Sequence, residues 1–238
     1  MTRLILIFLL FCSQLSASDF KDFAEAQENE YKVKLVLDRL QMAIGDVSQL
    51  NSMISTGLTT QPVMNGLTTF PLTTTVLFPD KLKLEYQGSE YILIGNKGWQ
   101  KYPEDYYEKM TDKQTSAISA NLKRNFISII KNLSIFKISY VEEKSVKGIM
   151  CDILHFTSNP IEFDLIVSQA NGLPIQMLYK RKYGEDEITI CRSFSGYFEI
   201  NGIMFPANTI TKDLEGNLIS EYVLEDVKIN PQLSKKDF

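Results

Sequence analysis

Turn signals divide most of this chain into short strands, and this feature limits its possible folds more than any other. From Phe136 onward, runs rich in Ile, Val, Phe and Tyr end at Lys147-Gly148, Asn171-Gly172, Gly184-Glu185-Asp186, Asn201-Gly202 and Glu215-Gly216-Asn217. Turns spaced roughly 8–12 residues apart are typical of an antiparallel meander, in which each strand pairs with the next. We therefore predict such a meander over this part of the chain.

The stretch Val76–Pro103 predicts further strands with one apolar face. Leu82, Leu84 and Tyr86 alternate with charged residues, so their side chains point to the same side of one strand. A sheet with one apolar face must be covered. The cover is either the protein's own core or a bound molecule, and the pattern alone leaves both open.

A hairpin precedes this stretch. Leu50–Phe78 is rich in Thr, Leu and Val and contains an Asn65-Gly66 turn signal. Pro71 cannot donate a backbone hydrogen bond, which predicts an edge strand or a bulge there.

Two segments predict helices. In Asp19–Ile44, apolar residues recur three and four positions apart, and Gly45 follows the last of them, as is common after a helix C-terminus. A second helix begins near Thr111 or Asp112 and carries an apolar stripe of Ile118, Leu122, Phe126, Ile129 and Leu133. Glu104–Lys113, charged and aromatic, is expected to be a loop. A helix between strands of one sheet crosses a face of that sheet, and its stripe suits either the core or a lid.

The N-terminus has the pattern of a secretory signal peptide. One cation, Arg3, precedes the apolar run Leu4–Phe11, which is too short to span a bilayer, and small polar residues follow. We expect cleavage after Ala17 and an exported, soluble protein. Lipid modification of Cys12 is the alternative, but the bulky Phe11 before it disfavours that processing.

Cleavage leaves two cysteines, Cys151 and Cys191. In a meander their strands are third neighbours, whereas a disulfide needs Cα atoms within roughly 7 Å. We expect unpaired thiols, with a disulfide as the alternative in an oxidising compartment.

Charge and motifs exclude several classes of function. The net charge of -4 and the lack of a long basic run argue against nucleic-acid binding. No zinc-protease, thiol-redox, hydrolase or P-loop motif is present, and the single histidine, His155, lies on a predicted strand where a structural role is more common than catalysis. The run Lys180-Arg181-Lys182 suits anionic head groups or a solvated strand end. We predict no enzyme, no metal and no cofactor.

Together these features predict an α+β fold in one domain, residues 18–238, after a signal peptide over residues 1–17. A strongly curved antiparallel sheet of about ten strands forms an unclosed half β-barrel covered by helices, with an N-terminal helix, because sheets of that size curl.

The chain resembles a family at several short motifs. These are Ala43-Ile44-Gly45, Phe78-Pro79-Asp80-Lys81-Leu82, Asn96-Lys97-Gly98-Trp99, Gly172-Leu173-Pro174, Gly202-Ile203-Met204-Phe205-Pro206 and Val227-Lys228-Ile229-Asn230. In this order they resemble the periplasmic outer-membrane lipoprotein carrier and sorting superfamily, the LolA-like and LppX-like proteins. The resemblance implies a half-barrel whose helices form a lid over a cavity for acyl chains, with the strand that carries Trp99 in its wall. No counterpart of the arginine that holds the lid closed in such carriers is identified.

The resemblance leads to a functional hypothesis. The chain is expected to be a monomeric periplasmic carrier of a lipid or an acylated lipoprotein, with the envelope membrane or a membrane receptor as a further partner. The expected cavity residues are Leu82, Leu84, Tyr86, Trp99, Ile118, Leu122, Phe126 and Ile129. The alternative is a non-enzymatic envelope interaction or regulatory module of the same fold that carries no lipid.

Overall fold

The computed structural model describes residues 17–102, 106–183, 186–233 and 237–238. The predicted signal peptide lies outside these ranges except for Ala17, and so does Cys12. Two residues of the predicted Gly184-Glu185-Asp186 turn also lie outside them. In the described ranges, no helix is long and apolar enough to cross a membrane.

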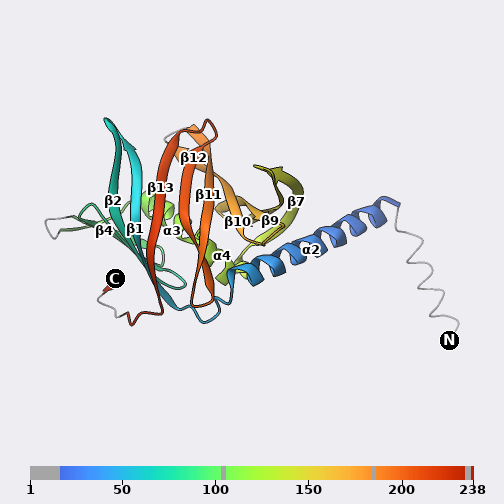
Figure 1. The fold of residues 1–238 in the computed structure, drawn as a ribbon, viewed down its shortest axis with the longest axis horizontal. Coiled ribbons are helices and arrows are strands. Elements are labelled where there is room, and N and C mark those ends of the chain that lie inside the picture. The colour runs from blue at the N-terminus through green and yellow to red at the C-terminus, as the bar shows by residue number, and fades with distance from the viewer. Residues whose placement is uncertain (1–16, 103–105, 184–185, 234–236) are drawn as a thin grey trace.

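All described strands join one antiparallel sheet, which Figure 1 shows as a curved wall that does not close. Its strands lie in the order β6-β5-β4-β3-β2-β1-β13-β12-β11-β10-β9-β8-β7. Their bounds are β1 (Ser52–Val63), β2 (Gly66–Leu77), β3 (Lys81–Tyr86), β4 (Ser89–Ile94), β5 (Lys97–Lys101), β6 (Tyr107–Lys109), β7 (Lys137–Val146), β8 (Ile149–Ser158), β9 (Ile161–Ser168), β10 (Pro174–Tyr183), β11 (Asp186–Ile200), β12 (Ile203–Asp213) and β13 (Leu218–Ile229). The predicted antiparallel, unclosed sheet with helices is confirmed.

In the part of the chain that the structure describes, the sheet has thirteen strands rather than about ten. Strand β6 lies inside the segment that we expected to be a loop, and it pairs with β5 at the edge of the sheet. A strand of three residues is too short to show a two-residue period, so the sequence pattern does not reveal it.

Strands β1 and β13 join the two halves of the sheet although they are the first and the last of its strands in the sequence. Their ladder runs from Met53 opposite Ile229 to Thr60 opposite Glu221. The Asn230 side chain secures the start of the ladder, because its Oδ1 accepts from the backbone N of Asn51 at 2.7 Å.

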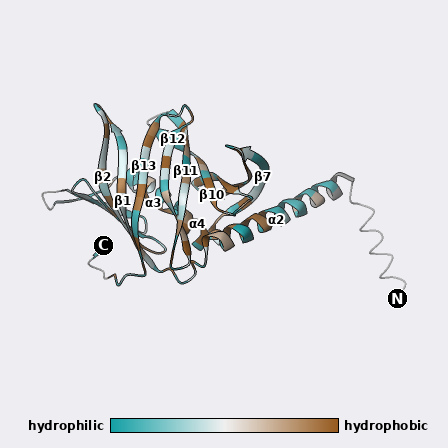
Figure 2. Ribbon diagram, in the orientation of Figure 1, coloured by the Kyte–Doolittle hydropathy of each residue, from teal (hydrophilic) through white to brown (hydrophobic). Residues whose placement is uncertain are grey.

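The N-terminal helix α2 (Ala17–Ile44) is confirmed, and Gly45 follows it with φ +95°. Its C-terminal half packs on the sheet through Val36, Leu40 and Ile44, which are buried. Its N-terminal half extends away from the sheet in Figure 1, and the hydropathy colouring of Figure 2 turns from brown near the sheet to mostly teal along the extension.

The expected second helix is broken into two. Helix α3 (Asp112–Lys123) begins with a capping box between Thr111 and Gln114, and α4 (Phe126–Lys131) follows after Arg124 and Asn125. Asn125 adopts an extended conformation, and its Oδ1 accepts from the Ile127 N at 3.0 Å. An N-cap in the middle of an apolar stripe ends one helix and starts the next. A short 3₁₀ turn, Leu133–Ile135, leads into β7.

Removing this internal cap gives a first prediction. Asn125→Ala is expected to lower the free energy of unfolding by about 1 kcal/mol, because the first amides of α4 lose their side-chain acceptor. Asn125→Asp keeps an acceptor and should stay within about 0.5 kcal/mol of the wild type. Urea denaturation measures both, and equal losses in the two variants would contradict a capping role.

The cysteines lie as expected. Cys151 is on β8 and Cys191 on β11, third neighbours in the sheet, and both thiols are free. Cys151 is buried in a small cluster with Ile153 and Ile166.

Candidate functional site

The sheet has an inner face, which we define as the face that α3 and α4 cover, and an outer face. Residues directly opposite each other in an antiparallel pair share a face. Leu84 lies opposite Thr74 on one side and Tyr91 on the other, and all three belong to the inner face. On β11, the Phe194 ring meets the Phe126 ring of α4 edge to face, with centroids 6.2 Å apart, so the inner face continues across the sheet.

Three adjoining hollows lie between the inner face and the helices. The first has a volume of about 610 Å³ and is lined by Thr59, Gln61, Phe70, Leu72, Leu84, Tyr86, Asn121, Tyr179, Arg181, Arg192, Thr209, Thr211, Ile219, Ser220 and Tyr222. The second, of about 300 Å³, includes Leu72, Thr74, Arg124, Phe126, Arg192, Phe194, Phe205, Tyr222 and Leu224 in its wall. The third, of about 260 Å³, is lined by Leu84, Tyr86, Tyr91, Met110, Gln114, Ala117 and Ile118. Shared residues connect them, and volumes of this size are typical of small-molecule sites.

Four of the eight predicted cavity residues line these hollows. Leu84, Tyr86 and Ile118 meet in the third hollow, where β3 faces α3. Phe126, the first residue of α4, lines the second hollow.

Three others are packed in the core and line none of the three hollows. Leu82, Leu122 and Ile129 are 4%, 7% and 0% exposed and belong to the main apolar cluster. These three residues therefore belong to the protein's own core, which the sequence left open as an alternative to a cavity lining.

Trp99 does not line the hollows with the other predicted cavity residues, so the expectation that it shares their cavity is wrong. It lies opposite Ile92, which lies opposite Lys83, so its side chain is on the outer face. The hairpin turn consists of two residues, Gly95 and Asn96, because Ile94 pairs with Lys97. A register shift of one residue moves every side chain to the opposite face.

Gly98 takes the inner position next to Trp99. A Cβ at Gly98 would lie 2.1 Å from Met110 Cε and 2.8 Å from Thr115 Oγ1. The missing side chain therefore lets α3 approach β5 closely, which sets the end wall of the third hollow.

The sequence interpretation missed a group of polar residues on the inner face. The Arg124 guanidinium lies 4.4 Å from the centroid of the Tyr179 ring, and that of Arg192 lies 5.3 Å from it. Arg192 Nη2 also donates to Tyr179 Oη at 3.0 Å. One signal was available: Arg192 interrupts an alternation of apolar residues, Ile188, Ile190 and Phe194, along β11.

The predicted cationic run divides between two places. Arg181 lines the first hollow, whereas Lys180 and Lys182 line a separate gap between β9 and β10. Lys180 Nζ is 3.1 Å from Glu187 Oε1. Only the middle residue of the run therefore reaches the hollows.

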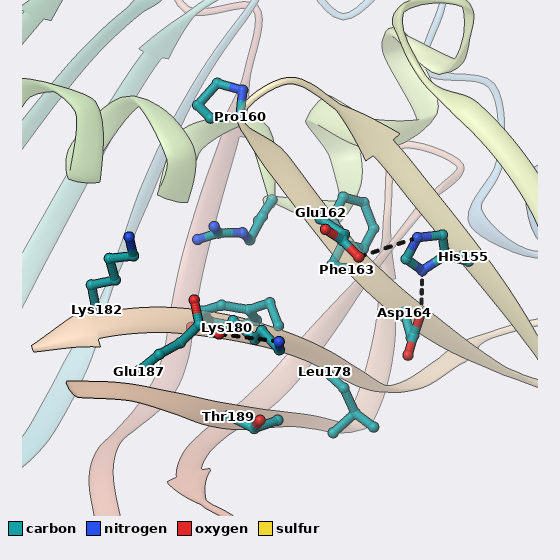
Figure 3. A pocket seen from close by; sticks show the side chains of 12 residues that line it. His155, Pro160, Glu162, Phe163, Asp164, Leu178, Lys180, Lys182, Glu187 and Thr189 are labelled. Carbon is teal, nitrogen blue, oxygen red and sulfur yellow. Dashed lines mark hydrogen bonds and ion pairs between the residues drawn. The ribbon is translucent and has the colours of Figure 1, made fainter. Parts of the chain in front are cut away.

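The gap forms because β9 and β10 diverge. They pair from Pro174 opposite Val167 to Leu178 opposite Asp164, and beyond that point a hollow of about 510 Å³ separates them. Figure 3 shows side chains from both strands around it. Arg124 lines this gap and the second hollow, so the two spaces meet at its side chain.

His155 lies beside this gap, between two carboxylates (Figure 3). Its Nδ1 is 2.6 Å from Asp164 Oδ1, and its Nε2 is 3.5 Å from Glu162 Oε1. In the described part of the chain, no group of three or more histidine, cysteine, aspartate or glutamate side chains is placed to hold a metal ion.

Burial shifts the pKa values of groups around the hollows. It is the largest cause that lowers the pKa of Arg124 and the largest that raises the pKa of Tyr222. It also raises the pKa of Tyr91 to about 12, with a contribution from Tyr86. These directions describe a poorly hydrated space that disfavours an uncompensated charge.

Comparison with known proteins finds likeness in structure only. No protein-family model matches the chain. No curated protein matches it by sequence.

Solved structures share the fold across nearly the whole chain. A DUF1329 family protein from Desulfovibrio piger has a TM-score of 0.63 and 16% identity, covering 85% of this chain and 95% of its own. A putative outer membrane lipoprotein-sorting protein domain from Vibrio parahaemolyticus has a TM-score of 0.60 and 11% identity, with coverages of 89% and 96%. A LolA superfamily protein from Nitrosomonas europaea has a TM-score of 0.59 and 13% identity, with coverages of 86% and 96%. The predicted LolA-like fold is confirmed.

Proposed function

We propose that this protein is a non-enzymatic periplasmic carrier that binds the acyl chain of a lipid or lipoprotein in the hollows of the inner face. The observation that carries the proposal is the set of adjoining hollows between a curved sheet and a broken helix. Their apolar lining includes Leu84 and Ile118 in the third hollow and Phe126 in the second. Fold likeness to a lipoprotein-sorting domain and to a LolA superfamily protein agrees with it.

Burial of methylene groups supplies the affinity. Each buried CH₂ contributes about 0.8 kcal/mol, so roughly ten of them contribute about 8 kcal/mol before the entropic costs of binding. A carrier that binds in this way therefore needs no catalytic motif. Release requires α3 or α4 to move relative to the sheet, and the break at Arg124 and Asn125 is the natural hinge.

Filling the second hollow tests the proposal. Thr74 lines it, so Thr74→Trp should place an indole where the acyl chain lies and weaken binding of an uncharged fluorescent monoacylglycerol by roughly tenfold or more. A fluorescence titration measures this loss.

The adjacent threonine provides the control. Thr73 lies opposite Glu85 and Thr56 on the outer face, so Thr73→Trp should leave the affinity unchanged. Wild-type protein that binds no monoacylglycerol would instead favour an interaction module that carries no lipid. Equal affinity of both variants and the wild type would place any binding outside the second hollow.

A further inference from the structure

Three arginines converge on one part of the inner face. Arg124 comes from the end of α3, Arg181 from β10 and Arg192 from β11, and two of them flank the Tyr179 ring. Arg192 lines both the first and the second hollow. Arg124 lines the second hollow and Arg181 the first, so all three reach the same connected space.

Among the described residues, no carboxylate lines the first or the second hollow. Arg124 Nε is buried and makes no hydrogen bond. The other two arginines are close enough that their charges also lower the pKa of Arg124, after burial. Arg124 also lines the gap that contains Glu162, Asp164 and Glu187, but among the described residues none of these carboxylates forms an ion pair with it. A partly desolvated cation without a full set of acceptors is unfavourable, so an oxyanion beside Arg124 in the second hollow is favourable.

Tyr179 supplies only some of the partners that the arginines require. Its ring is a favourable neighbour of both guanidinium groups, and its hydroxyl accepts one hydrogen bond from Arg192. A guanidinium has five N–H donors, so donors remain for an oxyanion. Tyr179 is only 4% exposed, so its ring is a well-packed neighbour for both guanidinium groups.

Apolar side chains lie directly beside the arginines. The second hollow combines Arg124 and Arg192 with Phe126, Phe194 and Leu224. A cationic end next to an apolar wall complements a molecule with an anionic head and a hydrocarbon tail. Phosphate suits this site because it carries more charge than a carboxylate and accepts bidentate hydrogen bonds from more than one guanidinium.

We propose that Arg124 and Arg192, which flank Tyr179, bind the phosphate headgroup of an acylated lipid whose chain runs from the second hollow through the first into the third, and that Arg181 adds to the cationic field there. The inference rests on the proposed function, since it assigns the head of the same ligand. The inference adds a prediction of selectivity, namely that an anionic lipid binds more tightly than an uncharged lipid with the same acyl chain.

Three probes separate the possible ligands. Titration calorimetry would compare lysophosphatidic acid, a monoacylglycerol with the same acyl chain, and inorganic phosphate. We expect the wild type to bind lysophosphatidic acid roughly tenfold or more tightly than monoacylglycerol, because hydrogen bonds to charged groups are the stronger class. Inorganic phosphate alone should bind at least about a hundredfold more weakly than the lipid, because it gains nothing from acyl burial.

Substitutions then locate the selectivity. Arg192→Gln and Arg124→Gln should each lower the affinity for lysophosphatidic acid by a larger factor than the affinity for monoacylglycerol, so that the ratio of the two affinities falls toward one. Arg192→Lys should retain part of the wild-type ratio. Lys212→Gln removes the same charge from the exposed neighbour of Thr211, which lies opposite Arg192, and should change nothing.

The outcomes distinguish the two proposals. Equal wild-type affinity for both lipids would overturn the headgroup site and leave the acyl carrier standing, and no binding of either would overturn both. Inorganic phosphate that competes as well as the lipid would assign the site to a free anion. Glutamine variants that lose stability but keep the wild-type ratio of lipid affinities would show that the arginines only stabilise the packing around Tyr179.

Discussion

Leu84→Asp is expected to abolish binding of an uncharged acyl lipid while the protein stays folded. Leu84 lines the first and the third hollow, so an aspartate there remains hydrated when the hollows are empty and loses that hydration when a chain enters. The expected loss of affinity is roughly a hundredfold, about 3 kcal/mol. A fluorescence titration with a labelled monoacylglycerol measures it.

Two further variants calibrate this result. Leu84→Asn has the same polar shape without the charge and should cause a smaller loss. Ile129→Asp places a carboxylate at a residue that is 0% exposed and should prevent folding, seen as loss of the cooperative thermal transition. If Leu84→Asp also fails to fold, Leu84 is packed core and the third hollow holds no ligand.

Gly45→Ala is expected to be the most destabilising small substitution in the chain. Gly45 ends α2 with φ +95°, and a Cβ there would lie 1.9 Å from the carbonyl oxygen of Gly202 in the turn between β11 and β12. Backbone strain and this clash together should lower the free energy of unfolding by about 3 kcal/mol or more. The clash is with backbone, so no side-chain rotation relieves it.

Two glycines with the same backbone conformation serve as controls. Gly148 and Gly216 have φ values of +81° and +91°, and a Cβ at either position meets nothing within 4 Å. Alanine at these sites should cost only the strain, about 1 kcal/mol. Urea denaturation compares the three, and equal losses would show that the contact of Gly45 with Gly202 does not hold α2 on the sheet.

Local patterns were enough to predict the sheet. Strands β7, β9, β10, β11 and β12 each end at a turn signal that the sequence shows, such as Asn171-Gly172, and short turns force antiparallel neighbours. The helix α2 was predictable because its apolar period stops at Gly45. These features depend on residues close in sequence.

The errors concern register and context. The family resemblance placed Trp99 in the cavity wall, whereas the hairpin register sets Trp99 opposite Ile92 on the outer face, and a shift of one residue is enough to reverse a side chain's direction. The break at Asn125 was hidden because an asparagine within an apolar stripe looks like one polar position of a continuous helix.

The arginine cluster could be recognised only once the fold was known. Arg124, Arg181 and Arg192 come from three elements, and only the curvature of the sheet around α3 brings them to the connected first and second hollows. From the sequence, Arg181 belonged to a cationic run that suited a solvated strand end. The alternation along β11 showed only that one inward position is polar.

The central claim is that an acyl chain lies between α3, α4 and the inner face. Photolabelling measures this directly, with a monoacylglycerol that carries a diazirine midway along its chain and mass spectrometry of the labelled residues. We predict adducts on residues that line the hollows, including Leu84, Phe126 and Phe194. Adducts confined to the outer face around Trp99, or to the projecting half of α2, would contradict the claim.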